Sequence, residues 1–525
     1  MLRLLLVSTL LASFTGCTCR GNGLKQIEQD PDAGCTPTTE VCNGKDDDCD
    51  GVVDDVVGEA PTCGVGECAR KAVLCDHGFP GTCTPGMPTA EVCNGKDDDC
   101  DGQTDEDLMP AMCGQGECAN VSSTCVAGVP SGCMPLPPKA EVCNGKDDDC
   151  NGSVDEGLVT NLTPDIRVTN DPASSDFVYA GWNGKNFALA WSDKRDGAAQ
   201  KGEIYVATLD AFGARVTPDT RITTTTGAST HPALAWDGNG YGLVYADDTP
   251  GNPELFFQHL DATGKPQGAA VRLTNATGNS LWPDVVWTGT EFAVAWEDSR
   301  AGAANTDIYF LRVDAQGKKI GTEVKVTTDG SKQNSPILKW DGQGFGLAWT
   351  DSRNTDRQVY FAKLSATGQR MGSEVNVSAT TFDAAWPDLA YSGSEWAVVW
   401  HDARFGSSNT EVYLQRLSGS GAKQGAATRL SQANGFSGYA SIDWNGYEYG
   451  VSWQDDRGGS PTIYFAQVSA QGQKNGAEKK LSNGTGAASF TTALWNGKTF
   501  GFAWRDERDG PSGNSEIYFA QVGCP

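Results

Sequence analysis

The sequence predicts an all-β protein, in which a seven-bladed β-propeller follows a small disulfide-rich repeat region. Three observations lead to this fold class. A unit of 51 to 54 residues recurs seven times after residue 160, a ten-residue acidic motif recurs three times before it, and the 525 residues include 18 cysteines. Repeats of about 40 to 50 residues that each hold four short strands are typical of propeller blades.

Each of the seven long repeats has an aromatic anchor, followed by a glycine turn and a strand of alternating large and small residues, such as 291–296. A further strand such as 308–313, an Asp-Ala-Xaa-Gly turn and a fourth strand such as 323–326 complete the repeat. Four strands per repeat predict one blade each. The anchors are Trp182, Trp236, Trp287, Trp340, Tyr391, Trp444 and Trp495.

The two ends of this region predict how the ring closes. The seventh repeat stops after its third strand, 517–522, and the segment Asp165-Ile-Arg-Val-Thr169 before the first anchor has the pattern of the missing fourth strand. We therefore expect an amino-terminal strand to complete the last blade, which removes exposed sheet edges. The propeller is assigned to residues 159–525.

The region 35–158 has a different composition. The motif Glu-Val-Cys-Asn-Gly-Lys-Asp-Asp-Asp-Cys occurs at 40–49, 91–100 and 141–150, and four further cysteines follow each of the first two copies. Long stretches lack apolar residues, so disulfides rather than a core must restrain this chain. The spacing does not determine the pairing. If Cys17 is modified, 17 cysteines remain, and an odd number leaves one unpaired or paired between chains.

Acidic residues in these motifs have the spacing of metal ligands. The region holds 25 acidic and six basic residues, which accounts for most of the net charge of −27. Acids at loop positions 1, 3, 5 and 9 and a glycine at position 6 suit a hard cation bound by oxygen, which favours calcium. These candidate ligands are Asp46, Asp48, Asp50 and Asp54; Asp97, Asp99, Asp101 and Asp105; and Asp147, Asp149, Asn151 and Asp155.

The loops differ from an EF-hand in two respects. Position 12 is Val57, Leu108 or Leu158, so the bidentate glutamate is missing, and no helices flank the loops. Acids at position 10 are candidates to supply the lost ligand. The alternative is a solvated acidic turn that only keeps the protein soluble. The position-10 acids are Asp55, Glu106 and Glu156.

The sequence Cys-Asn-Gly-Lys-Asp-Asp-Asp-Cys-Asp-Gly-Xaa-Xaa-Asp resembles the MopE-like metal-binding motif repeats of secreted bacterial proteins, and is also similar to thrombospondin type 3 calcium repeats. The resemblance covers roughly residues 35–158. It implies a metal-binding role, with copper as the alternative metal, because one member of the family is a surface protein linked to copper. No His or Met lies in the acidic motifs themselves.

The amino terminus predicts export. Arg3 precedes an apolar run over residues 4–12 that is too short to span a bilayer as a mature helix. Phe14-Thr15-Gly16-Cys17 resembles a bacterial lipobox, which implies lipidation of Cys17. Residues 1–17 are then the lipoprotein signal peptide and lipobox, and 18–34 a tether. The alternative is an ordinary cleaved signal peptide, with Cys17 in a disulfide.

Two periodic sets in the propeller are candidates for function. Five residues before each anchor stands an aromatic residue or His, except in the fourth repeat, which has Ser335. These residues predict a ligand face. The second set is an aspartate in every repeat, followed two residues later by arginine in six of them; it favours a structural turn clamp. The candidate ligand face is Phe177, His231, Trp282, Trp386, Tyr439 and Phe490.

Together these features indicate an exported protein, lipid-anchored at the bacterial cell envelope, at the outer membrane or cell surface. We expect it to bind calcium and to present the propeller to a glycan or protein ligand. The pI near 4.5 excludes a nucleic-acid partner. We expect no enzymatic activity, since no repeat pairs a lone nucleophile with a His; the alternative is a surface enzyme that processes glycosides or peptides.

Overall fold

The computed structural model describes residues 36–155, 158–196, 201–509 and 514–524. The chain divides into two compact units. The first comprises Met1–Cys113 with Asn120–Met134, and the second comprises Gly114–Ala119 with Pro135–Pro525. Neither of the helices in the described residues, the single 3₁₀ turns η1 (Gly66–Cys68) and η2 (Gly116–Cys118), has the length and apolar character needed to cross a bilayer.

The first unit contains only two- and three-residue strands, which form four small antiparallel pairs. Its apolar side chains are largely exposed, as Val57 is at 97%. Covalent links therefore take the place of a core, as the sequence predicted. The paired strands are β1 (Thr62–Cys63) with β2 (Arg70–Lys71), β3 (Cys75–Asp76) with β4 (Phe79–Pro80), β5 (Ala111–Cys113) with β6 (Asn120–Ser122), and β7 (Cys125–Val126) with β8 (Val129–Pro130).

The disulfides follow a repeating scheme that sequence spacing left open. In the second motif, the first cysteine bonds to the linker that follows, and the last cysteine bonds to the linker that precedes it, so the motif is held on both sides. A third bond closes each linker on itself. Bonds of the first unit between described residues include Cys42–Cys75, Cys63–Cys83, Cys68–Cys100, Cys93–Cys125 and Cys113–Cys133.

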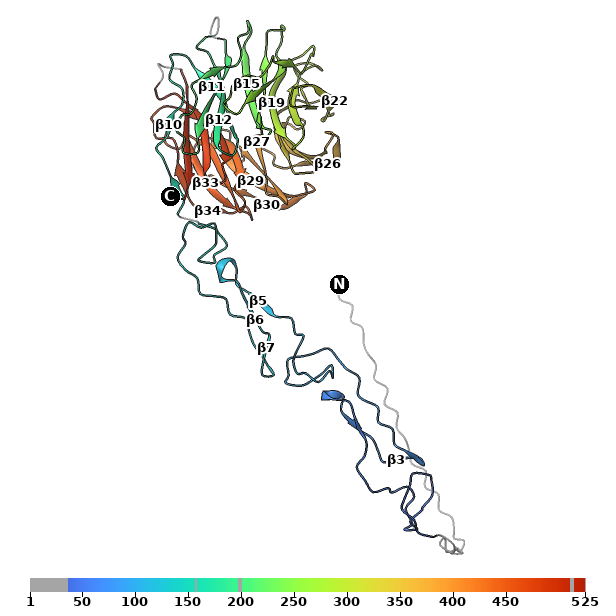
Figure 1. Cartoon of the computed structure of the whole chain (residues 1–525). Coiled ribbons are helices and arrows are strands. Elements are labelled where there is room, and N and C mark those ends of the chain that lie inside the picture. The colour runs from blue at the N-terminus through green and yellow to red at the C-terminus, as the bar shows by residue number, and fades with distance from the viewer. Residues whose placement is uncertain (1–35, 156–157, 197–200, 510–513, 525) are drawn as a thin grey trace, which may run out of the picture. The chain divides into compact units, whose positions relative to one another are not determined.

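The second unit contains the propeller (Figure 1), and its seven blades confirm the predicted fold class. Each blade is an antiparallel sheet. The innermost strands are β11 (Ser175–Trp182), β15 (Ser229–Trp236), β19 (Ser280–Trp287), β23 (Gln333–Trp340), β27 (Ala384–Tyr391), β31 (Ser437–Trp444) and β35 (Ala488–Trp495). The second strands are β12 (Asn186–Asp193), β16 (Gly240–Asp247), β20 (Phe292–Asp298), β24 (Gly344–Asp351), β28 (Glu395–Asp402), β32 (Glu448–Asp455) and β36 (Phe500–Asp506).

The outer half of each blade is less uniform. The third strands are β13 (Glu203–Asp210), β17 (Glu254–Asp261), β21 (Asp307–Val313), β25 (Gln358–Ser365), β29 (Glu411–Ser418), β33 (Thr462–Ser469) and β37 (Glu516–Gly523). The outermost strands of the first six blades are β14 (Thr220–Arg221), β18 (Val271–Arg272), β22 (Lys319–Lys325), β26 (Arg370–Asn376), β30 (Lys423–Arg429) and β34 (Lys474–Lys480). They are mostly polar and partly exposed, which suits the solvated edge of a sheet.

The amino-terminal segment closes the ring as predicted. Strand β10 (Ile166–Arg167) pairs antiparallel with β37, with Ile166 opposite Phe519. A second short strand that the sequence did not predict, β9 (Thr160–Asn161), pairs further along β37. The last blade is thus built from both ends of the propeller, which leaves β37 without a free edge.

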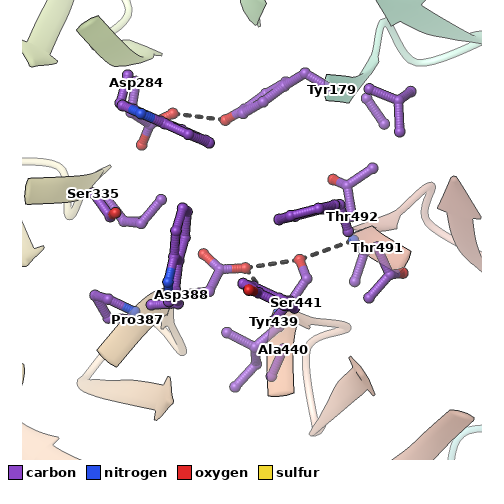
Figure 2. A pocket seen from close by; sticks show the side chains of 18 of the residues that line it. Tyr179, Asp284, Ser335, Pro387, Asp388, Tyr439, Ala440, Ser441, Thr491 and Thr492 are labelled. Atoms are coloured by element: carbon purple, nitrogen blue, oxygen red, sulfur yellow. Dashed lines mark hydrogen bonds between the residues drawn. The ribbon is translucent and has the colours of Figure 1, made fainter. Parts of the chain in front are cut away.

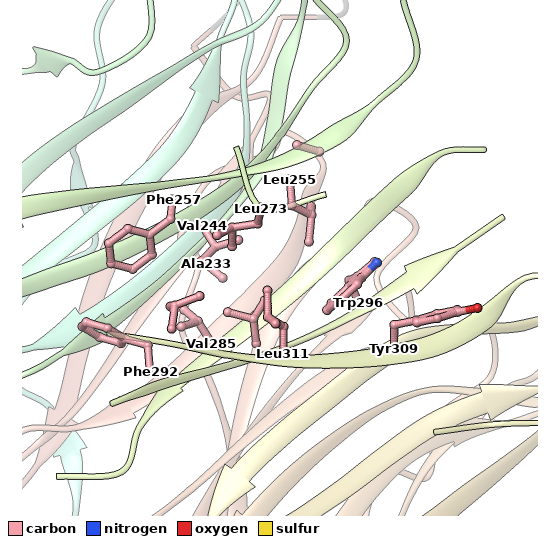
Figure 3. Close-up of a cluster of buried hydrophobic side chains, with 13 residues drawn as sticks. Ala233, Val244, Leu255, Phe257, Leu273, Val285, Phe292, Trp296, Tyr309 and Leu311 are labelled. Atoms are coloured by element: carbon pink, nitrogen blue, oxygen red, sulfur yellow. The ribbon is translucent and has the colours of Figure 1, made fainter. Parts of the chain in front are cut away.

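The core lies between neighbouring blades. Figure 3 shows one such cluster, in which Phe257 and Leu255 of the second blade pack against Phe292, Trp296 and other side chains of the third. Close packing explains the small residues on second strands. A Cβ atom added at Gly346 would lie 2.7 Å from the ring of Trp396 in the next blade, so only glycine leaves room for that indole.

Candidate functional site

The acidic loops bring their alternating aspartates together, as the spacing predicted. Carboxylate oxygens of Asp46, Asp48 and Asp50 lie within 4.8 Å of one another. The backbone is wound around the first of them, because Asp46 accepts hydrogen bonds from the N–H groups of Asp50 at 3.1 Å and Gly51 at 2.9 Å. Gly51 has a φ of 93°, which permits the turn at position 6. The second loop repeats this arrangement with Asp97, Asp99 and Asp101.

The position-10 acids join a second group in each of the first two loops. Asp55 lies with Asp48 and Glu40, and Glu106 lies with Asp99 and Glu91, again with oxygens within 4.8 Å of one another.

Glu40 and Glu91 were missed by the sequence reasoning, which counted positions only from the first aspartate. The signal that could have found them is their place as the first residue of the repeated ten-residue motif. Glu40 also organises its loop, since it accepts the N–H groups of Asp47 at 3.0 Å and Asp54 at 3.0 Å.

The aspartates at position 9 make a different contact. Asp54 accepts hydrogen bonds from the backbone N–H groups of Asn43 at 2.8 Å and Gly44 at 2.9 Å. Asp105 and Asp155 make the same pair of contacts in their own loops. These carboxylates therefore tie the end of each loop back to its beginning.

The third loop belongs to the second unit and contacts the propeller there. Asp147 accepts the N–H groups of Asn151 and Gly152, both at 3.0 Å, and the Asn151 amide donates to Asp149. Ser153 donates to Asn475 of β34 at 3.1 Å. The disulfide Cys143–Cys524 joins the motif to the end of β37, and Cys118–Cys150 joins it to η2. Glu156 lies outside the described residues.

The second loop has buried carboxylate oxygens and carboxyl groups with raised pKa values. One oxygen of Asp97 and both oxygens of Glu106 are buried without a hydrogen-bond partner among the described residues. Desolvation raises the pKa of Glu106, and the neighbouring carboxylates of Glu91, Asp101 and Asp99 raise it further. Desolvation likewise raises the pKa of Asp99. Unpaired buried carboxylates are costly, and a bound cation is the usual remedy.

The predicted ligand-face residues gather in the central channel of the propeller, where with Ser335 they form what we call the aromatic tier. Each lies at a β-bulge of an innermost strand and has a φ between 48° and 56°. Such a left-handed conformation is unfavourable for a non-glycine residue, and the bulge redirects the side chain. The tier is Phe177, His231, Trp282, Ser335, Trp386, Tyr439 and Phe490.

The six rings of the aromatic tier contact one another in a closed circuit. The centroids of His231 and Trp282 are 4.0 Å apart, and those of Trp282 and Trp386 are 5.1 Å apart across the small Ser335. Burial lowers the pKa of His231 to about 4, so it is neutral near pH 7. The rings are half-buried. They line a cavity of 270 Å³ in the channel.

Charged and polar side chains line the same cavity, two or four residues beyond the aromatic tier in the sequence. Figure 2 shows Tyr179 and Asp284 on one side of the cavity, and Asp388 and Ser441 on the other. Tyr179 donates to Asp284 at 2.7 Å, and Ser441 donates to Asp388 at 2.7 Å. We call this set the polar channel group; its members are Tyr179, Asp284, Lys339, Asp388, Ser441, Asp443 and Thr492.

The carboxylates of the polar channel group also connect neighbouring blades. Asp284 accepts the N–H group of Leu338 at 2.7 Å, Asp388 accepts that of Ile442 at 2.9 Å, and Asp443 accepts that of Trp495 at 2.6 Å. Desolvation raises the pKa of Asp284 and Asp443. Desolvation also acts on Lys339, but the three carboxylates outweigh it and raise the pKa of this ammonium.

The second periodic set is the structural clamp that its regularity favoured. In the first blade Arg195 makes a bidentate pair with the buried Asp193, at 2.9 and 2.6 Å, and stacks over Tyr205. Trp191 donates to the same carboxylate at 2.8 Å. Thr249 replaces the arginine in the second blade, and its N–H group still donates to Asp247. The other arginines in the same arrangement are Arg300, Arg353, Arg404, Arg457 and Arg508.

The predicted signal peptide, the lipidation residue Cys17 and the tether lie outside the described residues. Three segments, 31–55, 85–106 and 136–156, match the sequence model of the family described as "Putative metal-binding motif" (Cu-binding_MopE). The amino-terminal region therefore carries MopE-like metal-binding motif repeats, as the resemblance indicated. No curated protein matches the chain.

Solved structures resemble the propeller only in part. A protein of unknown function from Dyadobacter fermentans has a TM-score of 0.44 at 12% identity over 70% of this chain and 100% of its own. The endosialidase of phage phi92 has a TM-score of 0.42 at 9% identity, over 70% and 69%. A subtype N10 neuraminidase-like protein of A/little yellow-shouldered bat/Guatemala/060/2010 gives 0.39 at 8%, over 56% and 95%. Similarity this weak carries no argument for or against enzymatic activity.

Proposed function

We propose that this chain is an exported calcium-binding protein of the bacterial cell envelope, in which each acidic loop holds calcium and the propeller binds a glycan or protein. The observation that carries the calcium proposal is the burial of carboxylate oxygens in the second loop. Both oxygens of Glu106 and one of Asp97 are buried without a partner in the described residues, next to Asp99. A cation bound there would offset the repulsion among the five carboxylates of the two groups in this loop.

The donor atoms favour calcium over copper. The first two loops offer carboxylate oxygens from alternating residues, which suit a hard cation of flexible coordination. Copper prefers imidazole and sulfur. A third cluster does combine Cys93 and Cys125 with Asp105, but these cysteines form a disulfide and are not available as thiolates.

The loops would hold calcium through the alternating aspartates, with the position-10 acid and the motif glutamate completing the shell. In the second loop this set is Asp97, Asp99, Asp101, Glu106 and Glu91. Asp105 would close the loop by its backbone contacts instead of binding the ion directly. Disulfides and calcium together then take the place of a hydrophobic core in the first unit.

Export and anchoring complete the proposal. The disulfide-dense first unit suits an oxidising compartment, and the leader pattern that ends at Cys17 supports a lipid anchor. For the propeller, the support for ligand binding is the channel cavity of 270 Å³, which combines aromatic walls with charged groups.

The calcium proposal is tested by calorimetry on the chain without its first 17 residues. We expect it to bind about three calcium ions, one per acidic loop, and to prefer calcium to copper. Glu106→Gln should lose one site. Asp107→Asn removes a carboxylate from the exposed neighbouring residue and should retain all of them. No calcium binding in the millimolar range, a preference for copper, or an equal effect of both variants would contradict the proposal.

A further inference from the structure

The central channel contains one lysine that makes no direct polar contact with the described residues around it. Lys339 of β23 is half-buried and lines the cavity. Among the described residues, no hydrogen bond or ion pair involves its ammonium group. The three channel carboxylates influence it only over longer range, although they line the same cavity.

A structural role explains the carboxylates but not the lysine. Asp284, Asp388 and Asp443 each accept a backbone N–H group from the next blade, so they hold innermost strands together. Lys339 forms no comparable contact in the described residues, and its side chain is only half-buried where it lines the cavity. Its three N–H donors are therefore available to acceptors on a molecule that enters the cavity.

The cavity restricts what such a molecule can be. Its volume of 270 Å³ is far more than one ion or water needs and approaches the size of small-molecule sites. The occupant must accept hydrogen bonds from Lys339 and donate them to carboxylates such as Asp388 and Asp443. Hydroxyl groups do both, since each has one donor and two acceptor lone pairs.

The charged side chains around the cavity further restrict the class of molecule that can bind there. Three carboxylates facing the cavity oppose an anion such as an acidic sugar, and the ammonium of Lys339 opposes a positive group placed next to its own N–H donors. The rings of Trp282 and Trp386 supply an apolar wall for the carbon skeleton. A neutral molecule rich in hydroxyl groups satisfies all of these conditions.

We propose that the polar channel group, under the aromatic tier, is a binding site for one neutral monosaccharide unit. This inference rests on the proposed role of the propeller as a ligand-binding module and names the chemistry of its ligand. It is independent of calcium binding by the acidic loops. Lys339 would donate to sugar oxygens, and Asp388, Asp443 and the hydroxyl of Thr492 would fix the orientation of the ring.

The test is saturation-transfer NMR and calorimetry on the chain without its first 17 residues, with calcium present. The probes are the methyl glycosides of glucose, galactose, mannose and N-acetylglucosamine, with methyl glucuronoside and glucosamine as charged comparisons. We expect at least one neutral glycoside to bind in the millimolar range, more tightly than either charged sugar. Lys339→Met should weaken that binding at least tenfold, and the exposed-surface control Lys498→Met should leave it unchanged.

Removing an ammonium from among three carboxylates can itself destabilise the fold, so thermal unfolding is measured for each variant. If Lys339→Met does not fold, Thr492→Val tests the proposed site instead, because it replaces one cavity hydroxyl with a methyl group of similar size. A several-fold loss of affinity in that variant supports the proposal, and unchanged affinity overturns it.

Absence of binding by all four neutral glycosides also overturns the proposal. A parallel glycan and peptide array with the same protein separates the two levels of failure. If the array finds a ligand while the glycosides do not bind, the propeller remains a binding module and only the channel site is refuted. If the array is also silent, both the channel site and the binding role of the propeller fail.

Discussion

Closure of the propeller depends on a few residues at its amino-terminal end, which makes the ring sensitive to where the chain begins. A chain that starts at residue 160 retains β9 and β10, whereas one that starts at 171 loses both. The shorter chain lacks the pairing of Ile166 and Arg167 with β37, and the hydrogen bond from the N–H group of Val168 to Ile517 at 2.7 Å. Strand β37 then presents an unpaired edge.

The energetic cost can be estimated from two of the lost contacts. Glu516 is 1% exposed, and its carboxylate accepts from Arg167 and Thr169, both at 2.5 Å. Leaving such a buried charge without its partner costs about 3–5 kcal/mol. Exposing the site of Val168, which is 5% exposed, costs about 1.5–3 kcal/mol more. Together these losses approach the whole stability of an ordinary domain, about 5–15 kcal/mol.

The assay compares the two chains by light scattering and thermal unfolding, both with Cys524→Ser so that its thiol, left without Cys143, forms no cross-links. We expect the chain from 171 to aggregate and melt at a lower temperature, and a synthetic peptide of residues 159–170 to restore it. If both chains melt alike and remain monomeric, the closing segment does not hold the ring together.

A matched pair of point variants distinguishes the contribution of the Arg167–Glu516 ion pair from that of the closing strand. Arg221 forms the same contact with Glu203 inside the first blade, at 2.9 Å, where the chain is continuous. Arg167→Met and Arg221→Met should each lower the free energy of unfolding by a similar amount, and neither should cause the aggregation seen on truncation. A much larger effect of Arg167→Met alone would mean that this ion pair, rather than the strand, closes the ring.

Two further predictions concern anchoring and pH. Cys17→Ala should release the protein from membranes of a bacterial host; unchanged detergent partitioning, or a mature protein that begins downstream of Cys17, would contradict lipidation. Burial raises the pKa of Glu297 from 4.5 to about 7, so the folded chain keeps a proton that the unfolded chain releases, and this group lowers stability as pH rises from about 4.5 to 7. Glu297→Gln should remove that decline, which is worth about 3 kcal/mol. Urea unfolding at pH 5 and pH 8 measures it, and a free energy of unfolding that falls equally in the variant and the parent protein would contradict the prediction.

The sequence was sufficient to predict the propeller because its repeats are regular. The spacing of the anchors determines the number of blades, and a last repeat with only three strands requires a fourth from elsewhere. Strand β9 and the disulfide Cys143–Cys524 could not be predicted in this way. Each joins residues more than 350 positions apart, and the sequence contains no second copy of either with which to compare it.

The acidic loops were predictable where they follow a known pattern. The aspartates at positions 1, 3 and 5 converge as expected, but Glu40 and Glu91 lie before the point where an EF-hand loop would begin. The position-9 aspartates show the opposite problem, a spacing that suggests a metal ligand where the structure shows another contact. Their spacing suits a ligand, yet Asp54 accepts two backbone N–H groups, a contact that depends on how the loop turns back on itself.

The channel shows why periodicity alone does not locate a binding site. A feature present in nearly every blade, such as the clamp of Asp193 and Arg195, performs the same task in each blade, and that task is structural. A single small molecule on the axis of a seven-fold ring needs different groups on different sides. Lys339 occupies a position where the other blades have Gly181, Ala235, Val286, Ala390, Asp443 and Leu494, so it is the one cation at this position, where the proposed ligand would need directional contacts. In a repeat protein, departures from the repeat at its central axis are therefore the residues to test first for ligand binding.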